Sequence, residues 1–262
     1  MIDRDVIIVG GGPAGAACAW RLKQYQISPL ILEKSNFPRT KPCAGWLTPK
    51  VFELLETDPT KYPYGLTHFD SFKISLLGIK FRLPTHQYAI RRIEFDSWLM
   101  DRADVEVRQH QVRKIEKTSC GYTIDDQFHT KFLIGAGGTH CPVRQNFFKR
   151  IPSHQSDRLI IAKEEEFRYP IKDKDCHLWF FENGLPGYAW YVPKTDGYVN
   201  VGIGASADGL KKKEKTLNAY WNQLVEDLAS AKIVNDHPYQ PLGYSYYLRG
   251  ASQPPQIDNV FL

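Results

Sequence analysis

A glycine-rich segment near the amino terminus has the residue types and spacing of a phosphate-binding loop. Gly10, Gly12 and Gly15 form a G-x-G-x-x-G pattern directly after the apolar run Val6–Val9. The first glycine permits a tight turn, the second lets the backbone approach a pyrophosphate, and the third lets the next helix pack against a sheet. Glu33 follows 23 positions after Gly10, where a carboxylate accepts hydrogen bonds from ribose hydroxyls. The segment predicts dinucleotide binding and does not separate FAD from NAD.

The elements needed to position this loop follow in the order of a Rossmann-like unit. A buried strand over Val6–Val9 leads into a helix over Ala16–Leu22, and a second strand covers Pro29–Leu32. Further along, the apolar residues Phe132–Ile134 precede a second glycine-rich turn at Gly135–Gly138. At the first glycine loop, the free backbone N–H groups and the positive dipole end of the helix that follows favour a phosphate.

The rest of the chain is mainly of β type. Residues 68–90 alternate as two strands with a turn near Leu77–Gly78, and His177–Ala205 again has a β pattern. Lys211–Lys232 is predicted to form one amphipathic helix. The segment Ile257–Leu262 is predicted to form one strand.

Composition excludes several classes of protein. The chain has 262 residues and a net charge of +5, a mild and dispersed excess that does not indicate nucleic-acid binding. Attraction to acidic ligands or to an anionic membrane surface stays open. Many of the aromatic residues fall between His177 and Tyr247, which favours an apolar cavity there over a plain β core. The run Glu164–Glu166 is interpreted as solvated.

The cysteines and histidines do not have the spacing of a metal site. Five cysteines are scattered without a CxxC pair, and eight histidines show no ligand pattern, so no metal is expected. The apolar stretch Val6–Trp20 is too short and too glycine-rich to span a bilayer. It also lacks the basic start of a signal peptide. We therefore expect reduced thiols and a cytoplasmic location, with peripheral contact to a membrane left open.

With these segments in place, the sequence resembles the geranylgeranyl reductase family, within the wider group of p-hydroxybenzoate hydroxylase-like flavin enzymes. The glycine loop followed by Pro38–Arg39 resembles the extended flavin-binding signature, and Arg92–Asp96 resembles the R-x-x-F-D helix start. Gly135–Arg144 resembles the second flavin signature, with Gly137 in place of its acid and Cys141 in place of its serine. The resemblance covers essentially the whole chain.

Two further segments are more specific to that family. Pro186–Pro193 is similar to its Y-x-W-x-F-P pattern, and Lys41–Trp46 resembles its cysteine-bearing loop beside the flavin. The resemblance implies that Tyr188 and Trp190 wall the substrate side of the flavin and that the Cys43 thiol lies over its ring. The alternatives remain that both aromatic residues are ordinary core and that the cysteine is a small buried hydrophobe.

The resemblance also implies a fold class, α/β (α+β), in which a Rossmann-like FAD-binding domain carries an inserted, mostly antiparallel β-sheet substrate domain. The expected FAD-binding parts are residues 1–67 and 91–150, and the expected substrate-domain parts are 68–90 and 151–250. Residues 251–262 are expected to return to the FAD domain and to stop before the third flavin motif, as in a truncated chain.

The predicted function is FAD-dependent reduction of C=C bonds in an isoprenoid chain, by hydride transfer from reduced flavin, with NAD(P)H or ferredoxin as electron donor. The substrate is an isoprenoid or lipid-like small molecule, and the oligomeric state is left open. The alternatives are a flavin-dependent monooxygenase or halogenase of the same fold, or a non-catalytic nucleotide-binding fragment. The predicted catalytic residues are Cys43, Tyr188 and Trp190. The predicted cofactor-binding residues are Gly10, Gly12, Pro13, Ala14, Gly15, Glu33, Lys34, Arg39, Ala44, Gly45, Arg92 and Gly137.

Overall fold

A computed structural model describes residues 1–148, 158–248 and 255–262. The chain divides into two compact units, and each is described by itself. Unit 1 is formed within Met1–Thr40, Ile93–Ser153 and Gly250–Leu262, and unit 2 within Lys41–Arg92 and His154–Arg249.

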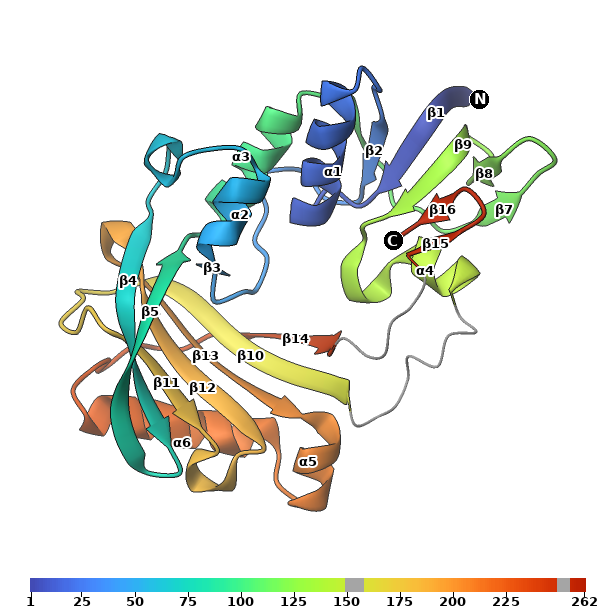
Figure 1. Cartoon of the computed structure of the whole chain (residues 1–262). Helices are drawn as coiled ribbons and strands as arrows, with labels where there is room; N and C mark the ends of the chain where they lie inside the picture. Colours follow the sequence, from blue (N-terminus) through green and yellow to red (C-terminus); the bar gives the residue numbers. More distant parts are fainter. Residues whose placement is uncertain (149–157, 249–254) are drawn as a thin grey trace. The chain divides into compact units, whose positions relative to one another are not determined.

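Unit 1 contains a mostly parallel sheet in the order β15-β16-β9-β1-β2-β6, to which β8 and then β7 are joined at β9 (Figure 1). The strands β2, β1 and β9 run parallel, and α1 follows β1 as in a Rossmann-like unit. The strands are β1 (Ile2–Val9), β2 (Leu30–Glu33), β6 (Val107–Gln109), β7 (Ile115–Lys117), β8 (Tyr122–Ile124), β9 (Phe128–Gly135), β15 (Gln256–Ile257) and β16 (Val260–Phe261). The helices are α1 (Pro13–Gln24), α3 (Arg92–Ala103) and α4 (Pro142–Phe147), with a short 3-10 turn η2 (Gly138–His140).

Unit 2 contains an antiparallel sheet in the order β14-β10-β13-β12-β11-β4-β5-β3, interrupted by one parallel pair, β11 with β4 (Figure 1). The strands are β3 (Trp46–Leu47), β4 (Thr67–Leu76), β5 (Ile79–Ala89), β10 (Leu159–Arg168), β11 (Cys176–Phe180), β12 (Gly187–Pro193), β13 (Tyr198–Ser206) and β14 (Leu242–Tyr247). The helices are α2 (Pro49–Leu54), α5 (Ala207–Lys212) and α6 (Leu217–Ser230), with 3-10 turns η1 (Pro59–Lys61), η4 (Glu182–Gly184) and η5 (Thr195–Gly197).

The sheet of unit 2 buries apolar side chains on both faces, because alternate residues of a strand point to opposite sides. On one face, Tyr191 and Ile203 pack with Trp221 and Leu228 of α6. On the other face, Trp190 belongs to a separate apolar cluster with Cys176, Leu178 and Val192. The predicted fold class is confirmed: a Rossmann-like α/β part and a mostly antiparallel sheet.

The structure differs from the predicted elements at two places. The single helix expected over 211–232 is two helices, α5 and α6, because Glu214 adopts a positive φ of 51° and Thr216 caps a new helix by accepting from the Ala219 N–H. The single strand expected over 257–262 is the hairpin β15–β16, which turns at Asp258 with a φ of 49°.

The boundary between the units also lies earlier in the sequence than residue 67. Residues 41–67 group with unit 2, because β3 pairs with β5 and the Gly45 carbonyl accepts a hydrogen bond from the Ile90 N–H. No helix in the described parts of the chain combines the length and the apolar character needed to cross a bilayer.

Candidate functional site

The glycine loop of unit 1, residues 10–15, joins β1 to α1 through very close backbone packing. Gly10 has a φ of 108°, and a Cβ there would lie 2.5 Å from the Ala136 carbonyl oxygen. A Cβ at Gly15 would overlap the carbonyl oxygen of Gly10. The second glycine-rich turn therefore lies against the first, since the backbone N of Gly137 is also close to Gly10. The carboxyl ends of β1 and β9 form one edge, where nucleotides bind in open α/β sheets.

Glu33 ties the end of β2 to this loop. Its side chain is buried, with Oε2 accepting from the Gly11 N–H at 2.7 Å and Oε1 accepting from the Ser35 N–H at 3.0 Å. A carboxylate oxygen has two lone pairs, so each can accept a further hydroxyl. The structure shows Glu33 holding the glycine loop through the Gly11 N–H. Its contact with a ribose stays a prediction.

The start of α1 and Arg39 together suit a bound phosphate. The N-cap of α1 is Gly12, which has no side chain to satisfy the first N–H groups, and Pro13 follows it. Arg39 Nη2 lies 3.4 Å from the fully buried Asp96 Oδ2. Arg39 Nε is also buried, with no hydrogen-bond partner among the described residues. The Arg39 guanidinium group therefore has an N–H donor to offer to a ligand. Its Nη2 atom lies 3.5 Å from the position of a Cβ built at Gly12. A cationic donor beside the start of α1 fits the pyrophosphate of a dinucleotide such as FAD.

The other predicted cofactor residues lie in different surroundings. Ala14 is exposed in the first turn of α1, and Lys34 is exposed after β2. Arg92 is the first residue of α3 and belongs to unit 2. Ala44 and Gly45 also lie in unit 2, where Gly45 has a φ of 79° and a Cβ would overlap the Ile90 carbonyl oxygen.

One face of the unit 2 sheet carries the predicted catalytic residues together with polar side chains. We call it the Trp190 face and define it by Tyr188, Trp190, Asn200, Glu164 and Tyr244. The strand registers place Trp190 and Glu164 on either side of Gly202 in the sheet. Trp190 of β12 is opposite Gly202 of β13, and Gly202 is opposite Glu164 of β10. A Cβ at Gly202 would overlap the Trp190 ring, so this glycine leaves the space in which the indole lies.

Hydrogen bonds connect the Trp190 face to the Cys43 loop. The Trp190 indole N–H donates to Asn200 Oδ1 at 2.7 Å, and Asn200 Nδ2 donates to Glu164 Oε1 at 3.3 Å. Glu164 Oε1 also accepts a short hydrogen bond from the Cys43 backbone N–H. The Tyr244 hydroxyl donates to Glu164 Oε2 at 3.3 Å. Two segments far apart in sequence, the Y-x-W strand and the cysteine loop, are thereby held together through one carboxylate.

The Cys43 thiol itself takes part in the conformation of its loop. Its Sγ accepts a hydrogen bond from the Gly45 N–H at 3.4 Å, and the side chain is half-buried. Trp190 is only 3% exposed, whereas Tyr188 is half-buried and stacks on Phe180 with ring centroids 5.2 Å apart. Tyr188 is therefore the more accessible of the two aromatic residues, and Trp190 acts chiefly through packing and its bond to Asn200.

The interpretation of Glu164–Glu166 as a solvated run is wrong. The three residues lie inside β10, and Glu164 is 3% exposed. Glu165 accepts from His237 at 2.9 Å, on the opposite face. Glu166 pairs with Arg91 at 2.9 Å and with the buried Lys194 at 2.6 Å. Strand alternation separates the side chains, so neighbouring carboxylates have different partners.

Burial shifts the pKa values of acidic groups on the Trp190 face. Desolvation raises the pKa of Glu164, although Asn200 and the Lys194 charge act in the opposite direction. Burial also raises the pKa of Tyr188 to about 12, with the neighbouring Tyr246, Cys43 and Glu164 adding to the shift. The Tyr188 hydroxyl is therefore a neutral donor at physiological pH.

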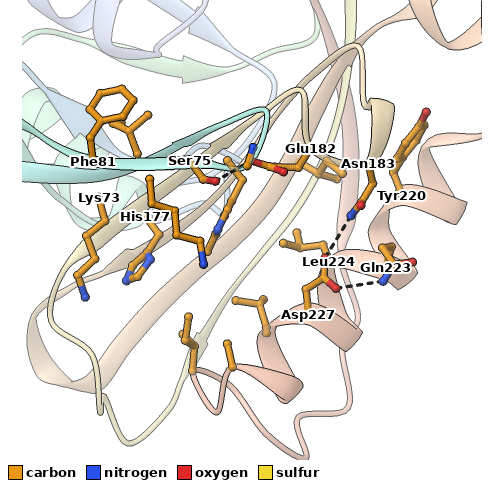
Figure 2. Close-up of a pocket in the computed structure, with 18 of the residues that line it drawn as sticks. Lys73, Ser75, Phe81, His177, Glu182, Asn183, Tyr220, Gln223, Leu224 and Asp227 are labelled. Carbon is orange, nitrogen blue, oxygen red and sulfur yellow. Dashed lines mark hydrogen bonds between the residues drawn. The ribbon is translucent and has the colours of Figure 1, made fainter.

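A pocket of about 670 Å³ lies on the opposite face of the sheet, which α6 covers. Figure 2 shows Lys73 and His177 on one side of it and Asn183, Gln223 and Asp227 on the other. None of the predicted catalytic residues lines this pocket. The expected cavity within 177–247 thus has a counterpart in the structure, but it is separated from Tyr188 and Trp190 by the sheet.

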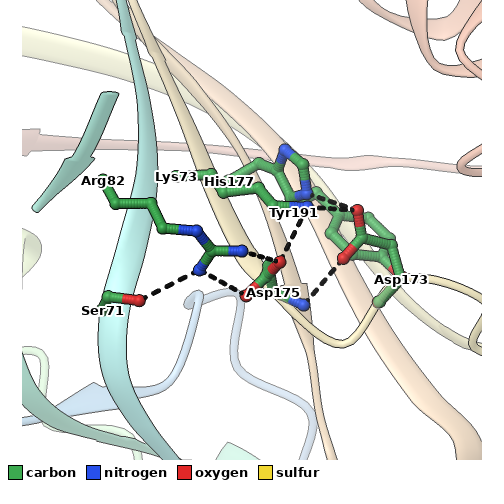
Figure 3. Close-up of polar contacts among 7 residues, drawn as sticks. All are labelled: Ser71, Lys73, Arg82, Asp173, Asp175, His177 and Tyr191. Atoms are coloured by element: carbon green, nitrogen blue, oxygen red, sulfur yellow. Dashed lines mark hydrogen bonds and ion pairs between the residues drawn. The ribbon is translucent and has the colours of Figure 1, made fainter. Parts of the chain in front are cut away.

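The charged groups beside this pocket are paired with one another (Figure 3). Arg82 donates two hydrogen bonds to Asp175, at 3.0 and 2.8 Å, and lowers the pKa of that carboxyl to about 2. Lys73 lies 2.9 Å from Asp173 and 2.7 Å from Asp175, and His177 lies 2.9 Å from Asp173. The network holds the loop before β11 against the hairpin β4–β5.

Sequence patterns did not identify three residues of the Trp190 face, namely Glu164, Asn200 and Tyr244. A signal was present for Asn200, which is a polar residue in the apolar strand Tyr198–Ser206 and is fully buried. A buried polar side chain in such a strand requires hydrogen-bond partners.

Comparison with known proteins agrees with this architecture. The geranylgeranyl reductase catalytic domain matches residues 158–237, and an NAD(P)-binding Rossmann-like domain matches residues 8–73. Digeranylgeranylglycerophospholipid reductase 1 of Methanopyrus kandleri is 28% identical over 226 residues, covering 78% of this chain and 58% of that protein. The chain thus spans less than two thirds of this relative.

Solved structures share the fold. A geranylgeranyl bacteriochlorophyll reductase-like protein of Thermoplasma acidophilum aligns over 100% of this chain and 70% of its own, with a TM-score of 0.83 and 19% identity. The flavin-dependent brominase Bmp2 aligns over 99% of this chain and 71% of its own, with a TM-score of 0.71 and 18% identity. The chain therefore shares its fold with both of these proteins. The resemblance to the geranylgeranyl reductase family is confirmed by the catalytic-domain match.

The glycine loop yields a first prediction. In Gly12→Val the nearest atom to the new Cβ is Arg39 Nη2 at 3.5 Å, so the fold is retained at a cost of about 1 kcal/mol for the poorer N-cap. FAD binding should be lost, because the branched side chain occupies the approach to the pyrophosphate. Gly15→Val should instead unfold unit 1, since its Cβ overlaps Gly10. Thermal unfolding and FAD titration are measured on both variants. Undiminished FAD affinity in folded Gly12→Val would contradict the assignment of this loop to the FAD pyrophosphate.

The buried carboxyl yields a second prediction, on pH. The folded state keeps a proton on Glu164 at pH values where the unfolded chain has lost it. The free energy of unfolding therefore falls as the pH rises from the ordinary value of 4.5 towards the raised pKa. The Glu164→Gln side chain cannot ionise, so this variant should lack the decrease in the free energy of unfolding that comes from Glu164. The control Glu226→Gln, at an exposed position, should keep that decrease. Denaturant titrations across pH measure this, and parallel curves for wild type and Glu164→Gln would refute it.

Proposed function

We propose that the chain forms the FAD-binding and catalytic parts of a reductase that saturates C=C bonds of an isoprenoid chain. The observation that carries the proposal is the hydrogen-bonded connection of Trp190, Asn200 and Glu164 to the Cys43 loop. It unites, within unit 2, the two segments that most specifically resemble the geranylgeranyl reductase family. The match of that family's catalytic domain to residues 158–237 covers Glu164, Trp190 and Asn200.

The residues of unit 1 fit FAD as the cofactor. The glycine loop and the uncapped start of α1 would bind the pyrophosphate, Arg39 would supply a cationic donor, and Glu33 would accept from the ribose. FAD in its reduced form supplies a hydride to a carbon–carbon double bond. NAD(P)H or ferredoxin is proposed as the source of its electrons.

The Trp190 face has the chemistry of a wall for a prenyl chain. Tyr188, Tyr244 and Tyr246 present aromatic surface, and Tyr244 and Tyr246 stack with ring centroids 6.1 Å apart. Large apolar surfaces with a few placed polar groups are typical of pockets for such ligands. The neutral Tyr188 hydroxyl is able to donate a hydrogen bond, while Glu164 positions the cysteine loop. Because prenyl chains occur on membrane lipids and quinones, contact with a membrane surface is part of the proposal.

A third prediction concerns Tyr188. In the FAD-loaded enzyme, Tyr188→Ala should retain flavin and lose most reduction of a prenyl lipid, or change which double bonds are reduced, because an aromatic wall is gone. Tyr191→Phe is the matched control, since Tyr191 lies on the same strand but on the opposite face, where its hydroxyl donates to the Asp173 carbonyl at 2.9 Å. Flavin absorbance and product mass are measured on both variants.

The outcomes separate the alternatives. A product that gains hydrogen supports a reductase, whereas a product that gains oxygen or a halogen indicates a monooxygenase or halogenase. If Tyr188→Ala retains both flavin and the wild-type product pattern, Tyr188 does not border the substrate. If Tyr191→Phe changes the products as strongly, the assignment of the Trp190 face is wrong.

A further inference from the structure

The hairpin β4–β5 brings together histidines that lie 18 positions apart in the sequence. His68 of β4 is opposite Tyr88 of β5, so His86 is its diagonal neighbour on the same side of the hairpin. The His68 Nε2 and His86 Nδ1 atoms are 3.1 Å apart, and Asp70 Oδ1 lies 3.5 Å from His68 Nε2. One ligand atom from each of the three residues falls within 4.8 Å of the others, and all three side chains are exposed.

A bulge in the hairpin lies beside these three side chains. Phe69 pairs with Gln87, but Ser71 pairs with Pro84, so two residues of β5 lie opposite Asp70. A bulge locally re-aims side chains, and Pro84 has no N–H to continue the ladder. His68 and Asp70, two positions apart on one strand, therefore share a side of the hairpin with His86.

We propose that His68, Asp70 and His86 bind a zinc ion on the exposed side of the β4–β5 hairpin. Zinc binds histidine nitrogen and carboxylate oxygen at about 2.0–2.2 Å in a tetrahedron, which places two ligand atoms about 3.3 Å apart. The distance from His68 Nε2 to His86 Nδ1, 3.1 Å, is slightly below that value, and the distance from His68 Nε2 to Asp70 Oδ1, 3.5 Å, is slightly above it. Three protein ligands leave the fourth position to water.

The surroundings of His86 orient the ring for this role. Its Nε2 lies 3.0 Å from the Tyr88 hydroxyl, so Nε2–H can donate there and leave the Nδ1 lone pair facing His68. Tyr88 is fixed in turn by edge contact with the buried Phe52, at a ring distance of 5.4 Å. Histidines that bind metals are commonly oriented through a hydrogen bond from their other nitrogen. The ion would clamp the base of a hairpin whose residues Ser75 and Phe81 line the pocket of unit 2.

His129 supplies a matched control. Like His68, it has potential metal ligands nearby, here the Asp3 carboxylate and the Cys120 thiol. However, Asp3 Oδ1 lies 2.8 Å from its Nδ1 atom, whereas Cys120 Sγ lies 3.5 Å from its Nε2 atom. These partners lie at opposite nitrogens of one ring, so a single ion cannot meet all three.

The test is metal titration of the tag-free chain after removal of metal by a chelator. Co²⁺ is added first for its tetrahedral absorption bands, and Zn²⁺ is then added to displace it, with calorimetry for the stoichiometry. We expect one equivalent in the wild type and in His129→Ala. Binding should be lost in His68→Ala and in His86→Ala, and weakened about tenfold in Tyr88→Phe. Zn²⁺ should raise the unfolding temperature of the wild type but not of His86→Ala.

Three outcomes would overturn the proposal. The first is the absence of saturable binding in the wild type, which would leave the histidines as a hydrogen-bonded pair only. The second is retention of one equivalent in the double variant His68→Ala/His86→Ala. The third is an equal loss of binding in His129→Ala. None of these outcomes bears on FAD or on prenyl reduction, so the proposal stands or falls separately from the proposed function.

Discussion

The burial of the Glu164 carboxylate is the constraint on which the arrangement of the Trp190 face depends. An acidic group with 3% exposure has lost its water, and its oxygens must be satisfied by protein donors. The Cys43 N–H, the Asn200 amide and the Tyr244 hydroxyl meet this requirement from a loop and two neighbouring strands. The need to satisfy one carboxyl thereby fixes the relative positions of the cysteine loop and the Y-x-W strand within unit 2.

In unit 1, close contact between backbone groups fixes the conformation of the glycine loop. Gly10 and Gly15 are required by overlap with neighbouring carbonyl groups, whereas Gly12 leaves open space beside Arg39. The loop is thus closely packed at Gly10 and Gly15, and it has no side chain at Gly12, the N-cap of α1. Glu33 strengthens it by accepting from the Gly11 N–H. A cradle of this kind can receive a pyrophosphate without rearrangement of the fold.

Local patterns in the sequence were sufficient to predict the glycine loop and the hairpin around Leu77–Gly78, whereas the fold class was implied by the resemblance to the geranylgeranyl reductase family. They did not predict features that depend on which strands become neighbours. Glu164 is buried because β10 lies between β13 and β14, and the acidic run alone does not contain that information. The approach of His68 to His86 likewise depends on the register and bulge of one hairpin. The break before α6 arises from the positive φ of Glu214, a conformation uncommon for its residue type.

Amide hydrogen exchange at Cys43 tests most directly whether Glu164 holds the cysteine loop. At pH values above the raised pKa of Glu164, where the carboxyl is charged, a hydrogen bond to it contributes about 1.5–3 kcal/mol, so Glu164→Ala should there speed exchange of the Cys43 amide by about one to two powers of ten. The amides of β12 with backbone partners in β13 should keep their protection, because their ladder is unchanged. Faster exchange confined to the Cys43 loop is the predicted result. Unchanged exchange at Cys43 in a folded Glu164→Ala variant would contradict the account.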